Sequence, residues 1–143
     1  MATPKKIIVP KALVKPRRRK RRVRIRGVYI STKMGVSMTF RSGWEFLYFK
    51  YLDAQPEVLQ FWSESLKIPY ATSRKTGRLR NYIPDLLIEY ADRKLLVEIK
   101  PKSKVSRPIN IKKFNAARLW CTVNAATFIV ITEIELKALG LMK

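Results

Sequence analysis

The chain has no histidine and a single cysteine, Cys121, among its 143 residues. These absences exclude an intramolecular disulfide, a zinc site built from thiolates and imidazoles, and every catalytic triad that requires histidine. The scarcity of cysteine also fits a reducing, cytoplasmic setting. Any catalysis must therefore run on carboxylates and lysine, with or without a hard metal ion.

Acidic residues are also scarce: 10 Asp and Glu stand against 31 Lys and Arg, which gives a formal charge of +21. Residues 1 to 44 hold 14 of these cations and no acid. Such an excess predicts a polyanionic partner, and nucleic acid is favoured over anionic lipid. No apolar stretch approaches the roughly 18 residues of a membrane span, and no signal peptide is visible, so no membrane partner is expected.

The N-terminal segment is expected to be a basic extended arm over residues 1–37, followed by one domain over 38–143. Prolines interrupt helix formation in the first 26 residues, and like charges repel one another within the run Arg17-Arg18-Arg19-Lys20-Arg21-Arg22. This run is predicted to bind nucleic acid. A solvated tail or a localisation signal is the alternative.

Hydrophobic periodicity after residue 42 predicts an α/β domain. Apolar residues at helical spacing indicate a helix over 43–54, a second from an N-cap at Asn110 to about Val123, and a short terminal helix over 133–141. The polar stretch 71–80 is expected to be a loop. Strands are predicted at Val58–Trp62 and Leu66–Tyr70 (one bent strand or two short ones), Tyr82–Tyr90, Lys94–Lys100 and Thr127–Thr132.

The runs 82–90 and 94–100 are close enough in sequence to form a hairpin. With a two-residue turn at Asp92-Arg93, Asp85 would lie opposite Lys100, and Leu87 opposite Glu98. Since cross-strand partners share a face and side chains alternate along a strand, Asp85, Glu98 and Lys100 would project together. A slip of one residue would scatter them.

Two carboxylates and an ammonium among apolar neighbours are costly to bury unless they pair or bind a cation. Asp85 and Glu98, with a backbone carbonyl such as that of Ile99, would make an all-oxygen site for Mg²⁺ or Mn²⁺. Lys100 would orient or deprotonate an attacking water, or neutralise charge that develops on a phosphate. The alternative is an ordinary surface ion pair between Glu98 and Lys100.

Glu45 is a further candidate, and two interpretations of it stay open. It follows Ser42 by three residues and would complete a capping box at the start of the first helix. Alternatively, its carboxylate would point from the helix N-terminus into the same metal site.

Four segments carry a resemblance to a known family: Arg41-Ser42-Gly43-Trp44-Glu45, Ser65-Leu66-Lys67-Ile68-Pro69-Tyr70, Asn81-Tyr82-Ile83-Pro84-Asp85 and Val97-Glu98-Ile99-Lys100-Pro101. Over about residues 38–132 the chain resembles the PD-(D/E)XK nucleases of the TnsA-type transposase endonuclease group. Within that group it is most similar to the small head completion nucleases of tailed bacteriophages. The resemblance implies a restriction-endonuclease-like αβββαβ core, a mixed central sheet flanked by helices, which agrees with the predicted element order.

The resemblance also implies site residues and a biological role. Glu45, Asp85 and Glu98 would be metal-binding acids, and Lys100 would be the catalytic lysine. The implied role is in finishing the packaged phage head, with portal, neck or capsid vertex proteins as partners. The protein would then act in the host cytoplasm during assembly or in the head–neck region of the virion.

The sequence thus supports two functional hypotheses. The first is a metal-dependent DNA endonuclease, and the second is a catalytically silent structural protein that binds DNA and portal. In either case a phosphate-binding surface is predicted, which would bind DNA largely without regard to sequence. Its residues in the folded domain are Arg74, Lys75, Arg78, Arg80, Lys112 and Lys113.

Overall fold

The computed structural model of the protein describes residues 26–143, so the basic run 17–22 lies outside the described residues. In chain order the elements are β1 Gly27–Ile30, β2 Ser37–Phe40, α1 Gly43–Ala54, β3 Val58–Ser63, β4 Ile68–Ala71, β5 Leu79–Tyr82, β6 Leu86–Tyr90, β7 Lys94–Ile99, α2 Lys102–Val105, α3 Pro108–Val123, β8 Thr127–Ile131 and α4 Glu133–Ala138. No helix in this part of the chain is both long and apolar enough to cross a membrane.

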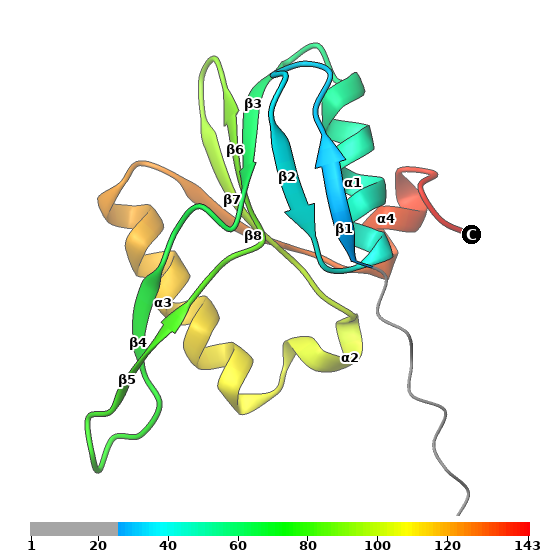
Figure 1. Cartoon of the computed structure of the whole chain (residues 1–143). Helices are drawn as coiled ribbons and strands as arrows, with labels where there is room; N and C mark the ends of the chain where they lie inside the picture. Colours follow the sequence, from blue (N-terminus) through cyan, green and yellow to red (C-terminus); the bar gives the residue numbers. More distant parts are fainter. Residues whose placement is uncertain (1–25) are drawn as a thin grey trace, which may run out of the picture.

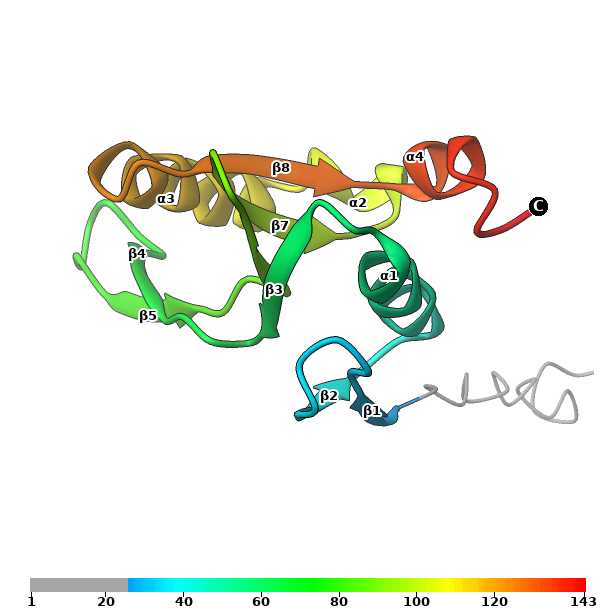
Figure 2. The ribbon, with the colours of Figure 1, turned by 90° about the horizontal axis from the view of Figure 1, so that it is seen from above.

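A four-stranded sheet in the order β3-β6-β7-β8 forms the centre of the fold. The pairs β3–β6 and β6–β7 are antiparallel, and β7–β8 is parallel. Helix α1 covers one face and α3 the other (Figures 1 and 2). Consecutive side chains of β7 alternate between the two cores: Val97 packs in the cluster with Phe49, and Leu96 in the cluster with Phe114. The predicted αβββαβ core and mixed sheet are therefore confirmed.

The β6–β7 hairpin differs from the prediction in its register. Leu86 pairs with Val97, and the amide of Tyr90 donates to the carbonyl of Arg93 at 2.8 Å, so the turn is Ala91-Asp92. The predicted pairing of Asp85 with Lys100 is wrong, because this register places Asp85 level with Glu98. The turn moved by one residue, which shifts each pairing by two positions and leaves every side chain on its predicted face.

The predicted strand Tyr82–Tyr90 is in fact divided. Strand β5 ends at Tyr82, and β6 begins at Leu86. Pro84 lies in the break, where its missing N–H would otherwise interrupt a strand ladder. As a result Asp85 stands just before β6, at the end of the sheet rather than within it.

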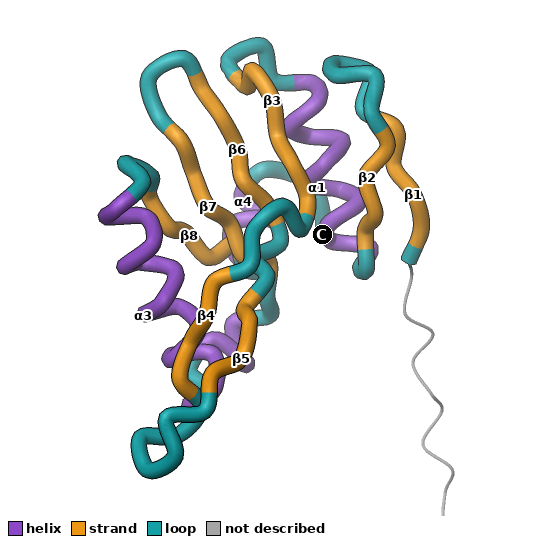
Figure 3. The backbone as a smooth tube through the Cα atoms, turned by 60° about the vertical axis from the view of Figure 1, so that its left-hand side comes forward, coloured by secondary structure: helices purple, strands orange, loops and turns teal. Residues whose placement is uncertain are grey.

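Strands β4 and β5 form a separate antiparallel hairpin that extends away from the central sheet (Figure 3). Of the two alternatives left open for residues 58–70, two separate strands, β3 and β4, are confirmed. The loop expected over 71–80 is wrong at both ends, because β4 extends to Ala71 and β5 already begins at Leu79. Gly77, at φ +63°, provides the left-handed backbone that closes the connection.

A second hairpin, β1–β2, precedes α1 and was not predicted. Its inward side chains Met38 and Phe40 are buried against the α1 side of the core, and Tyr29 packs edge-on against Phe46 of α1. The hairpin crosses the boundary expected between residues 37 and 38. Residues 27–37 therefore belong to the folded core and not to an extended arm.

Asp53, near the end of α1, fastens this hairpin. Its carboxylate accepts hydrogen bonds from the hydroxyls of Tyr29 and Ser31, the latter at 2.6 Å, and from the amide of Thr32 at 3.0 Å. Burial alone would raise the pKa of Asp53, but these bonds, with one from the amide of Lys33, outweigh burial and hold the pKa below its usual value.

Replacing Asp53 with alanine is expected to lower the free energy of unfolding by about 1.5–3 kcal/mol, the range for hydrogen bonds to a charged group. Because the folded-state pKa is lowered, the part of this contribution that depends on the charge of Asp53 is complete above the unfolded value near about 3.9 and is lost as the pH falls through the folded value. Urea denaturation at pH 7 and at lower pH measures both effects. An unchanged midpoint at pH 7 would contradict the assigned role.

Candidate active site

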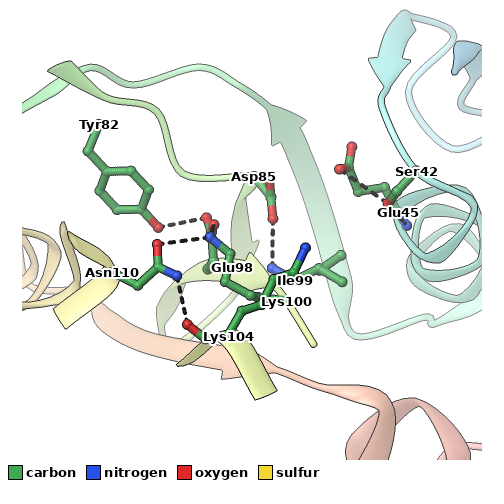
Figure 4. A network of polar contacts seen from close by, with 9 residues as sticks. All are labelled: Ser42, Glu45, Tyr82, Asp85, Glu98, Ile99, Lys100, Lys104 and Asn110. Carbon is green, nitrogen blue, oxygen red and sulfur yellow. Dashed lines mark hydrogen bonds and ion pairs between the residues drawn. The ribbon is translucent and has the colours of Figure 1, made fainter. Parts of the chain in front are cut away.

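The structure brings Asp85, Glu98 and Lys100 together at one end of β6 and β7 (Figure 4). The Oδ2 atom of Asp85 accepts a hydrogen bond from the amide of Ile99 at 2.7 Å. The Nζ atom of Lys100 lies 3.0 Å from Oε1 of Glu98. Glu98 and Lys100 are two residues apart at the end of β7, so strand alternation gives them the same face. The predicted convergence of two acids and one lysine is thus present.

Two further residues, Tyr82 and Asn110, complete the polar network and were not predicted as site residues. The hydroxyl of Tyr82 donates to Oε2 of Glu98 at 2.6 Å, so both carboxylate oxygens of Glu98 are engaged. The side chain of Asn110 accepts from Nζ of Lys100 at 3.3 Å and donates to the carbonyl of Lys104 at 2.7 Å. Figure 4 shows Tyr82 and Asn110 approaching Glu98 from the side opposite Glu45.

The prediction that Asn110 caps the second long helix is wrong. The N-cap is Arg107, and Pro108 takes the first helical position, where its fixed φ and missing N–H are tolerated. Asn110 consequently sits in the first turn of α3, where it is 5% exposed and directed at Lys100.

Glu45 lies at the start of α1 and faces this site from one side (Figure 4). It is 8% exposed, its amide donates to the Ser42 hydroxyl at 3.1 Å, and its carboxylate accepts from the amide of Arg41 at 3.0 Å. The Ser42 half of the predicted capping box is present. The carboxylate, however, satisfies the amide of Arg41 and not that of Ser42, so the reciprocal half is displaced by one residue.

The acids of the site perturb one another. Burial, followed by the carboxylates of Glu98 and Glu45, raises the pKa of Asp85 well above its usual value, and the Ile99 amide and Lys100 offset this only in part. Burial is also the main cause of the raised pKa of Glu45, to which the carboxylates of Glu64 and Glu98 add. Ionising Asp85, Glu98 and Glu45 together would therefore place more negative charge in the site than the single ammonium of Lys100 compensates.

A divalent cation would offset the repulsion between these buried carboxylates. Asp85 and Glu98 supply hard carboxylate oxygens, the donors that Mg²⁺ and Mn²⁺ prefer. Within residues 26–143, no three Asp, Glu, Cys or His side chains are arranged as a metal-binding group. Metal binding by Asp85, Glu98, Glu45 and the Ile99 carbonyl accordingly stays a prediction.

Basic residues predicted to contact nucleic acid gather on one side of the site. Arg74, Lys75, Arg78 and Arg80 are exposed on the β4–β5 hairpin. Lys112 of α3 donates to the carbonyl of Thr72 at 2.7 Å, which ties α3 to this hairpin. The Nζ atom of Lys113 lies 5.8 Å from the centre of the Tyr82 ring. Tyr82 thus connects this basic surface to Glu98.

Comparison with known proteins agrees with this geometry. A family model described as the TnsA-like endonuclease N-terminal domain matches residues 55–133. The match includes Asp85, Glu98 and Lys100, whereas Glu45 precedes it. The head completion nuclease of Enterobacteria phage T4 is 29% identical over 126 residues, covering 72% of this chain and 83% of that protein.

Proposed function

The chain belongs to the TnsA-like endonuclease family, and on that premise we propose that it is a metal-dependent DNA endonuclease that hydrolyses phosphodiester bonds. The observation that carries the proposal is the convergence of Asp85, Glu98 and Lys100 at one end of the central sheet. A surface ion pair would not require this arrangement, because Glu98 is 6% exposed and receives a second hydrogen bond from Tyr82.

Asp85 and Glu98 would hold Mg²⁺ or Mn²⁺, with the Ile99 carbonyl and Glu45 as further oxygen donors. When bound, such an ion supplies Lewis-acid stabilisation of the charge that develops on the phosphate. The Ile99 amide fixes one oxygen of Asp85 and leaves the other without a hydrogen bond from Ile99.

Lys100 would contact the reacting phosphate or the attacking water. An ammonium has three N–H donors, and the structure assigns two of them, to Glu98 and to Asn110. The third is available for substrate. Held between two acceptors, the ammonium is placed before the reaction begins, which is the condition under which an electrostatic group lowers a barrier most.

Tyr82 and Asn110 would act as positioning residues. Tyr82 holds one oxygen of Glu98, and Asn110 anchors Lys100 to the backbone of Lys104 through its own amide. Both reach the site from outside the β6–β7 hairpin. Tyr82 therefore links Glu98 to the basic β4–β5 hairpin, and Asn110 links Lys100 to α3. The hairpin and α3 would bind the DNA backbone.

The similarity to a phage head completion nuclease supports a more specific role. We propose that the protein acts during head completion of a bacteriophage, in the host cytoplasm, and that portal, neck or capsid vertex proteins are its partners. The head–neck region of the virion is the second proposed location.

Nicking of supercoiled plasmid DNA tests the enzymatic proposal. We expect the purified full chain to nick DNA in Mg²⁺ or Mn²⁺, to lose this activity when EDTA removes the metal, and to regain it when metal is restored. Retention of plasmid on a filter in EDTA reports binding separately. Binding without cleavage in either metal would favour the structural role, and cleavage that persists in EDTA would exclude metal dependence.

A further inference from the structure

Two arginines lie side by side beyond the paired ends of β1 and β2. The register pairs Gly27 with Phe40 and Val28 with Thr39, and its continuation sets Arg26 opposite Arg41. Side chains alternate along both strands, with Met38 and Phe40 buried and their neighbours exposed. Alternation therefore puts both arginines on the exposed face of the hairpin, together with the Val28–Thr39 pair.

These residues line a shallow hollow that is open to solvent. Its volume is about 300 Å³, and it is lined by Arg26, Gly27, Val28, Thr39 and Arg41. A phosphate group is small compared with this volume. Arg26 and Arg41 offer guanidinium N–H groups and Thr39 offers a hydroxyl, donors that a phosphodiester oxygen accepts, whereas Gly27 and Val28 make the lining partly apolar.

The charges of the two arginines are balanced only in part, because Glu64 pairs with Arg41 alone. Like charges placed opposite each other on a hairpin destabilise it. Arg41 pairs with Glu64 through Nε at 2.6 Å and Nη2 at 3.2 Å, which leaves further N–H donors for a second anion. No acid of residues 26–143 forms an ion pair with Arg26. The hollow thus has the electrostatics of an anion site.

We propose that this hollow binds a backbone phosphate of the DNA substrate, at a position away from the bond that is cut. The inference rests on the proposed function, and it assigns Arg26 and Arg41 to substrate binding. Arg41 is directly connected to the candidate active site, because its amide donates to the carboxylate of Glu45 at 3.0 Å. The backbone of Arg41 is thus in contact with Glu45, while its guanidinium is held by Glu64 on the exposed face of the hairpin.

The position of the hollow completes a path for the substrate. The β4–β5 hairpin and the β1–β2 hairpin stand on opposite sides of the region where β5, β6 and β7 approach one another (Figures 1 and 2). The first carries Arg74, Lys75, Arg78 and Arg80, and the second carries Arg26 and Arg41. DNA held on both sides would pass over the acids between them. Contacts to backbone phosphates fix its position without reading its sequence.

The salt dependence of DNA binding tests the proposal on the full chain. Affinity for a fluorescent duplex is measured in EDTA between about 0.05 and 0.2 M salt for wild type, Arg26→Gln and Arg41→Gln. Arg26→Gln is the main variant, because Arg41 also pairs with Glu64. The matched control is Arg93→Gln, which removes the same charge next to the β6–β7 turn. Arg93 lies at the end of β6 and β7 that is opposite to Ile99.

We expect Arg26→Gln and Arg41→Gln each to weaken binding similarly for unrelated sequences and to reduce the slope of log affinity against log salt by about one. Arg93→Gln is expected to keep the wild-type slope. The melting temperature of Arg26→Gln should equal or exceed that of wild type, because one of two opposed like charges is removed. A lower melting temperature would identify Arg26 as structural and overturn the proposal.

An unchanged slope in both variants would also overturn the proposal. A loss of binding to a poly-glutamate peptide, with DNA binding intact, would instead identify an acidic protein segment as the occupant and would likewise overturn it. Because binding is measured without metal and without cleavage, this result is independent of the nicking assay. A chain that binds with the expected slopes and never cuts DNA would refute the nuclease while leaving the phosphate site in place.

Discussion

Replacing Lys100 with methionine is expected to slow metal-dependent DNA cleavage by roughly 10²–10³-fold, the usual loss when one pre-positioned electrostatic group is removed. Methionine keeps an unbranched chain of similar length beside Phe114, over whose ring the ammonium now lies at 5.8 Å. What disappears is the positive charge between Glu98 and Asn110. Single-turnover cleavage of a duplex at saturating protein measures the chemical step, and binding in EDTA should change little.

A matched control is available on the same strand. Lys94 lies at the opposite end of β7, and its Nζ atom is 3.9 Å from Glu89. Lys94→Met removes the same charge at a distance from Asp85 and Glu98. This variant should cleave DNA at close to the wild-type rate. Lys100→Arg should stay impaired, because a planar guanidinium differs in shape from the compact ammonium that Glu98 and Asn110 now hold. Cleavage by Lys100→Met within a few-fold of wild type would remove Lys100 from the mechanism.

The part of this site that lies on one hairpin was predictable from sequence. Asp85, Glu98 and Lys100 come together although the predicted turn was displaced by one residue. The prediction survived because side chains in a strand repeat every two residues, and the displacement changed each pairing by two positions. A change of one position in each pairing would have turned Asp85 to the opposite face.

The residues that hold the three groups in place were not predictable, because their roles depend on contacts distant in sequence. Tyr82 reaches Glu98 only because the predicted strand is interrupted at Pro84. As a result β5 leaves the central sheet and pairs with β4. Asn110 looked like a helix cap because asparagine is common at that position. Pro108 is a local signal that α3 begins earlier, but nothing local shows that this start directs Asn110 at Lys100.

The β1–β2 hairpin is not predicted by the sequence for a different reason. Its strands are four residues long, and the high cation content of the whole N-terminal segment masked the alternation of Met38 and Phe40. Its stability comes from Asp53, a residue more than 20 positions away from Tyr29 and Ser31. Such a strand pair gains its hydrogen-bond partners and its buried face only in the folded protein.

Asp85→Asn is expected to abolish metal-dependent cleavage and, in the absence of metal, to stabilise the protein at pH 7. The substitution removes a charge disfavoured by burial and by the carboxylates of Glu98 and Glu45, while the new side-chain oxygen can still accept from Ile99. The expected gain is about 0.5–2 kcal/mol, the usual range for a single stabilising substitution. Urea denaturation in EDTA, with Asp92→Asn in the exposed turn as control, measures the difference.

The direction of the pH effect follows from the raised pKa of Asp85. The folded state binds its proton more tightly than the unfolded state does, so wild-type stability falls as the pH rises from the unfolded value near about 3.9 through the folded value. The advantage of Asp85→Asn should therefore shrink toward pH 4. Mg²⁺ should reverse the order at pH 7, since a ligand at 100 times its Kd adds about 2.7 kcal/mol to wild type and little to the variant. An Asp85→Asn protein that is less stable than wild type in EDTA, or that responds equally to Mg²⁺, would show that Asp85 maintains the fold and does not bind metal.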